Sequence, residues 1–439
     1  MRTTAIKYLA SSLAALAASF SFAAAQTIAI QNARVYTMAG ENAGRIDNGD
    51  VIIRDGVIAA IGQDLTAPEG ATVINAGGRI VTPGLFAPWS QIGLVELSLD
   101  GEANDSSTDP ETGGDFPLSA ALDAADAFNP MSSVIAVNRA GGVTRAVSAP
   151  EPGAKMFGGL GAVVDLSGRA DSVFRAQALQ SVAMGAAGIG YNGGTRLGNW
   201  AALRDALDEA KAYAANPGAY LMRPRQGGLA IGDLKALGPV ARGAQPLVVA
   251  VNSAADIRTL IKLKAQYGVN AIILGGMEAH LVAKEIAAAG IPVILNPMRN
   301  LPSQFEDLSA TLANAAKLNA AGVVIAFYDP PSGTHNLRLL PQLAGNAVAN
   351  GLPYEAALEA LTINPARIYG AADRLGSLEI GKVGDVVVWD GDPLETSTRP
   401  IAVLIDGRVT SLKNRQTMLR DRYKDLSRGE LPLAYRGAQ

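Results

Sequence analysis

Residues 81–93 read VTPGLFAPWSQIG, an apolar segment that is interrupted by the pair Pro83-Gly84. Short apolar runs with turn residues between them precede this segment, and longer helical and α/β patterns follow it. A Pro-Gly pair inside an apolar run is a strong signal for a break between two elements. The segment therefore predicts a hinge between two folds.

The chain on the N-terminal side of this hinge has the pattern of short β-strands. In residues 27–80, Asp55-Gly56 separates two apolar runs and predicts a two-residue hairpin, because a type I′ turn needs positive φ at its central positions. The same pattern returns after residue 370, where Asp406-Gly407 is a second hairpin signal. Since chain ends often lie close together, residues 27–80 and 371–412 are predicted to form one small discontinuous β-sandwich domain.

Residues 81–370 alternate between apolar strand-like runs and amphipathic helical segments. Such a β/α repeat is typical of a parallel barrel, so the predicted fold class is α/β, with a (β/α)8 TIM-type barrel. Val81 to Phe86 is expected as strand one and Gly322 to Phe327 as strand eight. The fourth strand is not placed, because residues 171–243 have a mostly helical pattern. The other expected strands are 142–148, 161–166, 246–251, 271–274 and 291–295.

The two ends of the chain have patterns of their own. Residues 1–25 contain Arg2 and Lys7, then an apolar stretch, then Ala23-Ala24-Ala25, which is typical of a secretory signal peptide. The alternative is a membrane anchor, but the apolar stretch is short and rich in Ala and Ser. We therefore expect an exported protein, periplasmic or secreted, that has no stable membrane anchor after cleavage. Residues 413–439 are predicted to form a C-terminal helix and tail.

The net charge and the amino-acid composition limit the kinds of partner and of chemistry that are expected. The chain has 439 residues and a net charge of -3, with acidic and basic residues interspersed, so it offers no basic field for nucleic acid. It contains no cysteine, which excludes thiolate catalysis and disulfides. The expected partner is a small-molecule ligand, and the sequence carries no signal for an oligomeric state.

Five motifs stand out along the chain: NARVYT at 32–37, IAAIG at 58–62, VTPGL at 81–85, LTINPARIYG at 361–370 and GSLEIGKVGD at 376–385. They resemble motifs of the amidohydrolase superfamily, in particular its imidazolonepropionase-like branch. The resemblance covers nearly all of residues 27–412. It implies a split β-sandwich, a (β/α)8 barrel, and a hydrolase that acts on carbon–nitrogen bonds other than peptide bonds.

The resemblance also implies a metal site, and here the sequence departs from the family. Active relatives hold zinc or another divalent metal through His-x-His on strand one, His on strands five and six, and Asp on strand eight. The metal lowers the pKa of bound water to about 7. In this chain the first three positions are Trp89, Gln91 and Ala250, and strand six ends in Gly275-Gly276 without a histidine. We therefore expect no cofactor and no metal centre of the family type.

The remaining polar residues near the expected strand ends are the candidate site. Asp329, after strand eight, and His335, in the following loop, are the candidate catalytic residues, although Asp329 before Pro330 is also a common turn residue. The candidate substrate-binding residues are Trp89, Gln91, Asn252, Glu278 and His280. For Glu278 the alternative is a helix-capping role, and for His280 a structural one.

Two functions follow from these residues. The first is a periplasmic amidohydrolase-family enzyme whose metal-dependent mechanism is lost, with Asp329 and His335 as acid and base. The second is a non-catalytic relative that binds a small molecule or a partner protein through the barrel mouth. Trp89 favours the second, because an indole at the ligand position makes the mouth more apolar.

Overall fold

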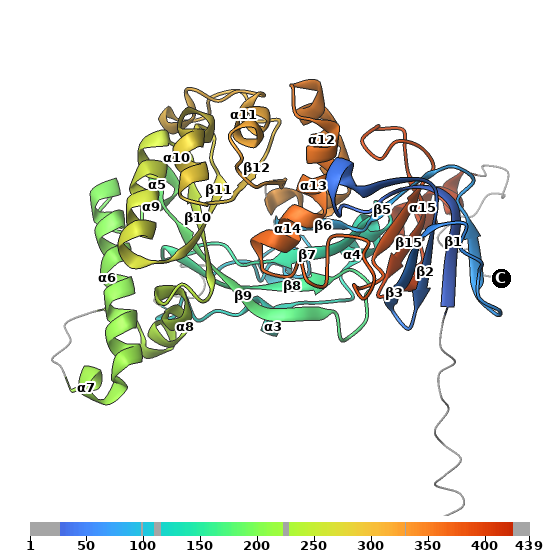
Figure 1. Cartoon of the computed structure of the whole chain (residues 1–439). Helices are drawn as coiled ribbons and strands as arrows, with labels where there is room; N and C mark the ends of the chain where they lie inside the picture. Colours follow the sequence, from blue (N-terminus) through green and yellow to red (C-terminus); the bar gives the residue numbers. More distant parts are fainter. Residues whose placement is uncertain (1–26, 98–99, 109–115, 223–227, 330, 425–439) are drawn as a thin grey trace, which may run out of the picture.

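The computed structural model describes residues 27–97, 100–108, 116–222, 228–329 and 331–424. A large barrel-like domain carries a smaller sheet at one side (Figure 1). The predicted signal peptide lies outside the described residues. Among the helices of the described part, none is long and apolar enough to span a bilayer.

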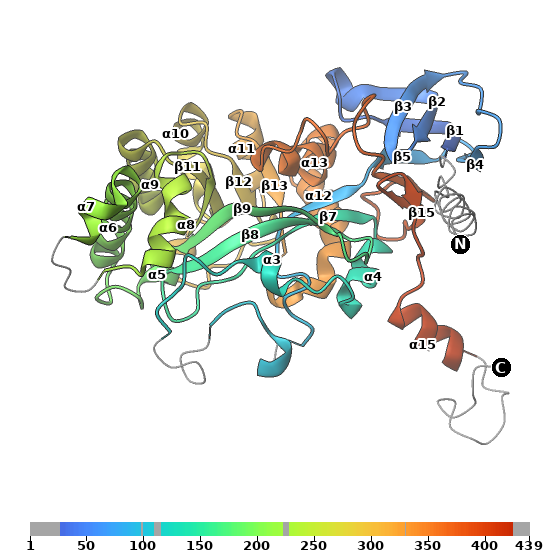
Figure 2. The same cartoon turned by 90° about the horizontal axis from the view of Figure 1, so that it is seen from below.

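The smaller sheet contains strands from both ends of the chain. β5 pairs antiparallel with β14, so the N-terminal and C-terminal strands share one eight-stranded sheet (Figure 2). Its order is β16-β15-β14-β5-β1-β2-β3, and β4 pairs with β1. The strands are β1 (Thr27–Tyr36), β2 (Arg45–Arg54), β3 (Val57–Gln63), β4 (Thr72–Asn75), β5 (Ile80–Pro83), β14 (Val386–Trp389), β15 (Pro400–Ile405) and β16 (Arg408–Val409). The division of this domain into two sandwich layers stays a prediction.

The predicted hairpins lie at the expected turns of this sheet. Asp55 and Gly56 have φ of 51° and 84° between β2 and β3, and Asp406 and Gly407 have φ of 51° and 67° between β15 and β16. These values fit the left-handed conformation that short hairpin loops require.

The second sheet forms a nearly closed barrel, in the order β13-β12-β11-β10-β9-β8-β7-β6. The strands β9 to β13 are parallel, but β8 is antiparallel to both β7 and β9. The prediction of a uniform (β/α)8 repeat is therefore wrong at this point, because β7, β8 and β9 follow one another without an intervening helix. The strands are β6 (Leu85–Ser90), β7 (Val143–Ser148), β8 (Phe157–Asp165), β9 (Val173–Ala183), β10 (Pro246–Val251), β11 (Asn270–Gly275), β12 (Val293–Leu295) and β13 (Ile325–Phe327).

Two strand predictions need correction. The run Val81 to Phe86 is divided at Gly84 between β5 of the smaller sheet and β6 of the barrel. The missing fourth strand is β9, inside the stretch that was predicted to be mostly helical. Ala and Gln in β9 favour a helix, but pairing with β8 on one side and β10 on the other holds this segment extended.

Several helices cover the barrel strands of the chain's second half. The helices of the described residues are α3 (Ala124–Ala127), α4 (Ser133–Arg139), α5 (Gly185–Gly188), α6 (Arg196–Ala215), α7 (Pro217–Leu221), α8 (Ile231–Ala241), α9 (Ala254–Tyr267), α10 (Ala283–Ala288), α11 (Asn314–Ala320), α12 (Leu340–Ala349), α13 (Tyr354–Leu361), α14 (Ile363–Ile368) and α15 (Arg415–Tyr423). Short 3-10 turns are η1 (Glu41–Gly44), η2 (Gly101–Ala103), η3 (Ala279–Val282), η4 (Phe305–Asp307) and η5 (Pro331–Leu339).

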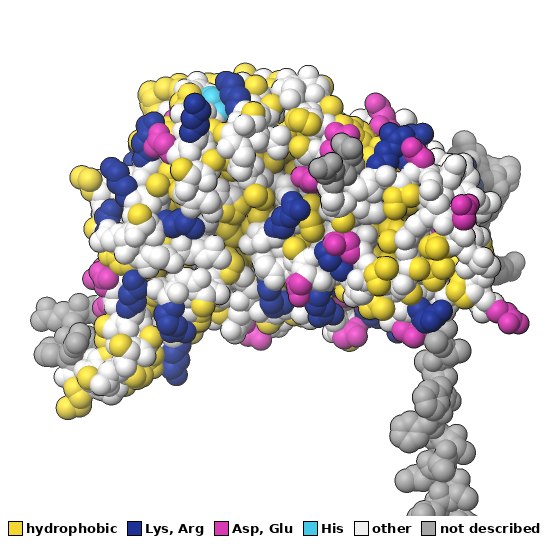
Figure 3. All heavy atoms as spheres, in the orientation of Figure 1, with side chains coloured by type: hydrophobic (Ala, Val, Ile, Leu, Met, Phe, Trp, Pro, Cys, Tyr) yellow, Lys and Arg dark blue, Asp and Glu magenta, His cyan; other side chains and the backbone are white. Residues whose placement is uncertain are grey.

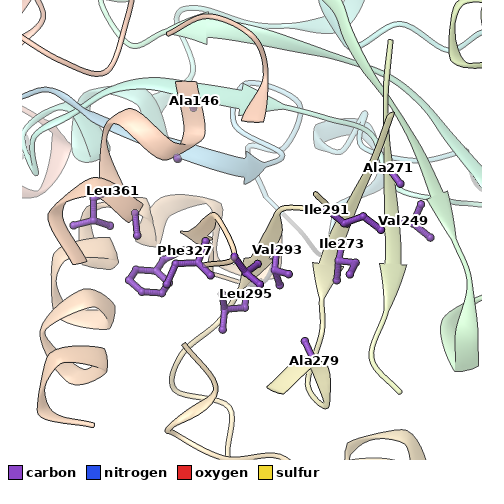
Figure 4. Close-up of a cluster of buried hydrophobic side chains, with 14 of the residues drawn as sticks. Ala146, Val249, Ala271, Ile273, Ala279, Ile291, Val293, Leu295, Phe327 and Leu361 are labelled. Carbon is purple, nitrogen blue, oxygen red and sulfur yellow. The ribbon is translucent and has the colours of Figure 1, made fainter. Parts of the chain in front are cut away.

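Alternation along the strands produces two apolar layers. Val249, Ile273 and Val293 belong to the cluster between the strands and the helices, which Figure 4 shows. Val248 and Ile272, one residue earlier on their strands, belong to a separate cluster inside the barrel. Complete burial of one such side chain contributes about 1.5–3 kcal/mol, so both layers stabilise the barrel.

The hinge between the two sheets has no room for a side chain at Gly84. A Cβ there would lie 2.1 Å from Oγ1 and 2.6 Å from Cβ of the buried Thr144. We expect Gly84→Ala to lower the free energy of unfolding by about 1–3 kcal/mol, the usual range for overpacking. Gly190→Ala is the control, because a Cβ at Gly190 meets nothing within 4 Å. Urea denaturation measures both, and equal stability of the two variants would contradict the steric account.

Candidate functional site at the barrel mouth

A cavity of about 250 Å³ lies where several barrel strands end. Ala183, Ala250 and Leu274, near the C-terminal ends of β9, β10 and β11, form one side of it. Trp89 from β6 and Glu151, three residues after β7, also line it. The C-terminal face of a barrel is where enzymes of this fold carry their functional groups. This mouth cavity is therefore the candidate site.

Trp89 is fixed at the border of the mouth cavity. Its side chain is 2% exposed and packs in the cluster inside the barrel. The preceding carbonyl, of Pro88, accepts a hydrogen bond of 2.7 Å from the hydroxyl of Tyr369. The indole Nε1–H of Trp89 is buried and has no hydrogen-bond partner in the described part of the chain. An indole nitrogen is only a donor, so Trp89 contributes a ring surface and an N–H but no metal ligand.

Glu151 is the ionisable group of the mouth cavity. Burial raises the pKa of its carboxyl group, and a hydrogen bond with Gln91 opposes this shift. The negative charge of Glu151 acts on two tyrosines. Burial raises the pKa of Tyr191, and Glu151 adds to that effect. Burial likewise raises the pKa of Tyr328 to about 12, with further contributions from Glu151 and Asp329. A carboxyl group with a raised pKa in an apolar cavity is a stronger base than an ordinary carboxylate and is suited to proton transfer.

Sequence reasoning missed Glu151, although a signal was present. The residue follows the strand expected at 142–148, and the carboxyl ends of parallel strands meet at one face of a barrel. Gln91 was predicted as a substrate-binding residue. In the structure Gln91 is 5% exposed and its side chain forms a hydrogen bond with the Glu151 carboxyl group, and a contact with substrate stays a prediction.

Asp329 lies two residues after the end of β13 and is half-buried. The amide of Asn296 donates to its Oδ1 at 3.4 Å. Burial raises the pKa of Asp329, whereas the charges of His335 and Arg299 lower it. His335 is exposed, and the described residues contain no hydrogen bond or ion pair between its ring and Asp329. The two candidate catalytic residues therefore interact through their charges without direct contact.

The other three candidate residues do not line the mouth cavity. The amide of Asn252 donates to Glu306 Oε1 at 3.1 Å. Glu278 accepts hydrogen bonds from the backbone N–H of Ala254 (3.1 Å) and of Ser309 (3.3 Å). It thus caps the first turn of the neighbouring helix α9, not its own turn. All these contacts join loops at the rim of the mouth.

His280, in η3, is half-buried. Burial lowers the pKa of its imidazole, and the charge of Lys317 acts in the same direction. Its Nδ1 has no hydrogen-bond partner within the described residues. A lowered pKa means that the ring is mainly neutral at physiological pH.

The residues at the family's ligand positions do not fit a zinc ion. Positions 89, 91 and 250 supply an indole, an amide and a methyl group, and β11 is followed by glycine. Structural and catalytic zinc sites use at least three groups from imidazole, thiolate and carboxylate. In the described part of the chain, no three His, Cys, Asp or Glu side chains lie close enough together to hold a metal ion. That the protein binds no metal stays a prediction.

Comparison of the sequence with known proteins finds similarity to amidohydrolases. Residues 239–413 match the profile described as "Amidohydrolase family". The chain is 25% identical over 401 residues to the amidohydrolase tasK of Hapsidospora irregularis, which covers 82% of this chain but 39% of that protein. It is 26% identical over 396 residues to the imidazolonepropionase of Sphingopyxis alaskensis, with 83% of this chain and 92% of that one covered.

The structural comparison agrees. The crystal structure of an amidohydrolase from Thermotoga maritima superposes with a TM-score of 0.77 and 27% sequence identity, and covers 88% of this chain and 99% of that chain. The chain spans about two fifths of the length of the fungal relative and nearly the full length of the two bacterial ones. Together these comparisons support the amidohydrolase superfamily, imidazolonepropionase-like branch, for this chain.

Proposed function

We propose that the protein hydrolyses a carbon–nitrogen bond of a small neutral amide or lactam in the mouth cavity, without the metal ion that the family uses. The single observation that carries this proposal is Glu151, a half-buried carboxyl group with a raised pKa that lines the mouth cavity. The residues that line the cavity include no Lys, Arg or His, which favours a neutral substrate.

In the proposed reaction, the Glu151 carboxylate removes a proton from a water molecule. The oxygen of that water attacks the carbonyl carbon, and the carbon–nitrogen bond then breaks. The leaving nitrogen takes the proton from Glu151, so the products are a carboxylic acid and an amine, and the carboxylate is regenerated. Gln91 orients the Glu151 carboxyl group, and Asp329 is a second carboxyl group near Tyr328.

A second candidate function is binding without turnover. Its supporting observation is Trp89, which occupies the position of the family's first histidine and lines a largely apolar cavity. In this case the protein retains the barrel for recognition of a small molecule or a partner protein. The first function predicts product, and the second predicts only a bound ligand.

A panel of small amides and lactams separates the two functions. The chelator-treated protein is incubated with each compound, and the carboxylic acid product is detected by mass spectrometry. We expect product formation that added zinc does not change. Turnover that depends on added zinc would contradict the metal-free mechanism. Thermal stabilisation by a compound that is never cleaved, lost in Trp89→Ala, would support the binding function instead.

We further propose that this activity takes place outside the cytoplasm, on the basis of the N-terminal pattern of residues 1–25. N-terminal sequencing of the protein from the periplasmic fraction or the medium is expected to begin at Gln26. Recovery of the intact chain with Met1 in the cytoplasmic fraction would contradict export.

A further inference from the structure

A second cavity, of about 770 Å³, lies at the opposite face of the barrel. Its residues include Pro246, Asn270, Pro292 and Val323, which lie at or just before the N-terminal ends of β10, β11, β12 and β13. Catalytic groups of barrel enzymes lie at the other face, so the proposed hydrolysis does not use this N-terminal cavity. Its volume is within the range of about 300–1,000 Å³ that is typical of small-molecule sites.

The N-terminal cavity has an excess of positive charge. Arg175 on β9, Lys235 on α8 and Arg367 on α14 line it, and none of its lining residues is Asp or Glu. Within the described residues, none of these three cations forms an ion pair with a carboxylate. Asp373, whose charge raises the pKa of Arg175, and Glu379, whose pKa the charge of Arg367 lowers, do not line the cavity. Three cations at a cavity whose lining residues include no carboxylate favour an anion there.

Contacts with the chain hold the two guanidinium groups in place. Arg175 donates through Nη2 to the carbonyl of Tyr369 and through Nη1 to that of Gly370 at 3.4 Å, while its Nε is buried without a partner in the described residues. Arg367 donates through Nη1 to Asn364 Oδ1 at 2.9 Å. Each guanidinium has five N–H donors, so both retain donors for a ligand. Fixed guanidinium groups suit the planar carboxylate better than flexible ammonium groups do.

A buried glutamine at the same cavity provides an independent indication of a ligand. Gln245 is 7% exposed, and its Nε2 donates to the carbonyl of Gln177 at 2.7 Å. Because that carbonyl can only accept, the orientation of the Gln245 amide is fixed. Its Oε1 is therefore left without a donor in the described part of the chain. A buried acceptor without a partner is uncommon in proteins. An N–H or O–H group of a ligand can supply the missing donor.

We propose that the N-terminal cavity binds a small organic carboxylate that has an apolar body and an N–H or O–H group. Arg175 and Arg367 hold the carboxylate, Lys235 lies at the rim, and the N–H or O–H group donates to Gln245. The apolar part of the wall, which includes Ile291 and Val323, favours an organic acid over an inorganic anion. Figure 3 shows one face of the molecule, on which hydrophobic side chains gather near the centre and Lys and Arg side chains lie around them.

Isothermal titration of the full chain with three probes tests this site. The probes are N-acetylphenylalanine, its neutral analogue N-acetylphenylalaninamide, and inorganic phosphate, so that both organic probes carry an N–H donor for Gln245. We expect the carboxylate to bind at least about tenfold more tightly than the amide, because loss of one charge-assisted contact commonly costs that much. We also expect it to bind more tightly than phosphate. Equal affinity for carboxylate and amide would overturn the proposal, and tighter binding of phosphate would identify an inorganic-anion site instead.

Variants localise the binding. Arg175→Gln and Arg367→Gln are each expected to weaken carboxylate binding about tenfold or more. Arg258→Gln is the control, because Arg258 is an exposed arginine paired with Glu285 outside the cavity. Lys235→Gln, at an exposed position, keeps the test valid if Arg175→Gln does not fold, and is expected to weaken binding as well. Unchanged binding in all folded cavity variants would overturn the proposal. The mouth variant Trp89→Ala is expected to retain carboxylate binding, which separates this site from the proposed hydrolytic one.

Discussion

Arg145→Met is expected to lower the free energy of unfolding by about 3–5 kcal/mol, the range observed when one partner of a buried ion pair is removed. Arg145 lies on β7 of the barrel, and its side chain is 3% exposed. Its Nε donates to Asp385 Oδ2 at 2.5 Å, and its Nη2 donates to Asp406. Asp165 on β8 lies 3.8 Å away. Asp385 and Asp406 belong to the smaller sheet domain, so this arginine joins the two domains.

The size of the effect follows from the charges that remain. Burial alone lowers the pKa of Arg145, but Asp385, Asp406 and Asp165 together raise it above its ordinary value. Without the guanidinium, two almost fully buried carboxylates, Asp165 and Asp385, lose their main cation, although Arg169 still pairs with Asp165 and Asp406. Methionine fills a similar volume, so lost charge pairing and not a cavity dominates the change.

Urea denaturation measures this prediction, and Arg258→Met is the matched control. Arg258 pairs with Glu285 at 3.0 Å, but both side chains are about half exposed. Exposed pairs contribute at most about 1 kcal/mol, so the control variant is expected to remain close to the unmodified protein. If both variants lost the same stability, the interdomain ion network would not be the main link between the two domains.

Glu151→Gln is expected to reduce kcat/KM for the cleaved amide or lactam by about 10²–10⁴-fold, the usual contribution of a general base. Glutamine retains the shape and the contact with Gln91 but cannot take a proton from water. Because burial raises the pKa of Glu151, the active carboxylate is present only above that raised value. The activity of the unmodified protein is therefore expected to fall as the pH decreases through a value above about 4.3, the ordinary pKa of glutamate.

Two further variants test whether Glu151, and not another carboxyl group, is the base. Glu285→Gln, on the exposed surface of α10, is the control and is expected to retain full activity. Asp329→Asn tests the pair that was predicted from the sequence. A larger loss in Asp329→Asn than in Glu151→Gln would assign the base to Asp329, with His335 acting on it through charge.

The sequence predicted the two hairpin turns, because the conformation of a short turn depends mainly on the residues in the turn itself. The hairpins at Asp55-Gly56 and Asp406-Gly407 need positive φ, and the residue types at those positions indicate it directly. The strand β9 could not be predicted in this way. Its middle residues, with Ala and Gln, favour a helix, and it is held extended by β8, which directly precedes it, and by β10, which follows much later in the chain.

Part of the candidate site could be predicted from the sequence, because some of its residues lie at positions that a family motif defines. Positions Trp89 and Gln91 were identified because they replace two histidines in a known motif. Glu151 was missed because its importance comes from burial and from its contact with Gln91, and neither is visible in the residue types alone. Glu278 was expected at the mouth, but it caps α9, a role that depends on how two loops pack together.

The central claim is that this amidohydrolase barrel works without the metal of its family, and metal analysis tests it most directly. Purified protein is analysed for zinc, iron and manganese by mass spectrometry, and its melting temperature is measured before and after chelator treatment. We expect far less than one metal ion per chain and an unchanged melting temperature. A stoichiometric metal, with a chelator-induced loss of stability that zinc restores and that His280→Ala or His335→Ala abolishes, would contradict the account.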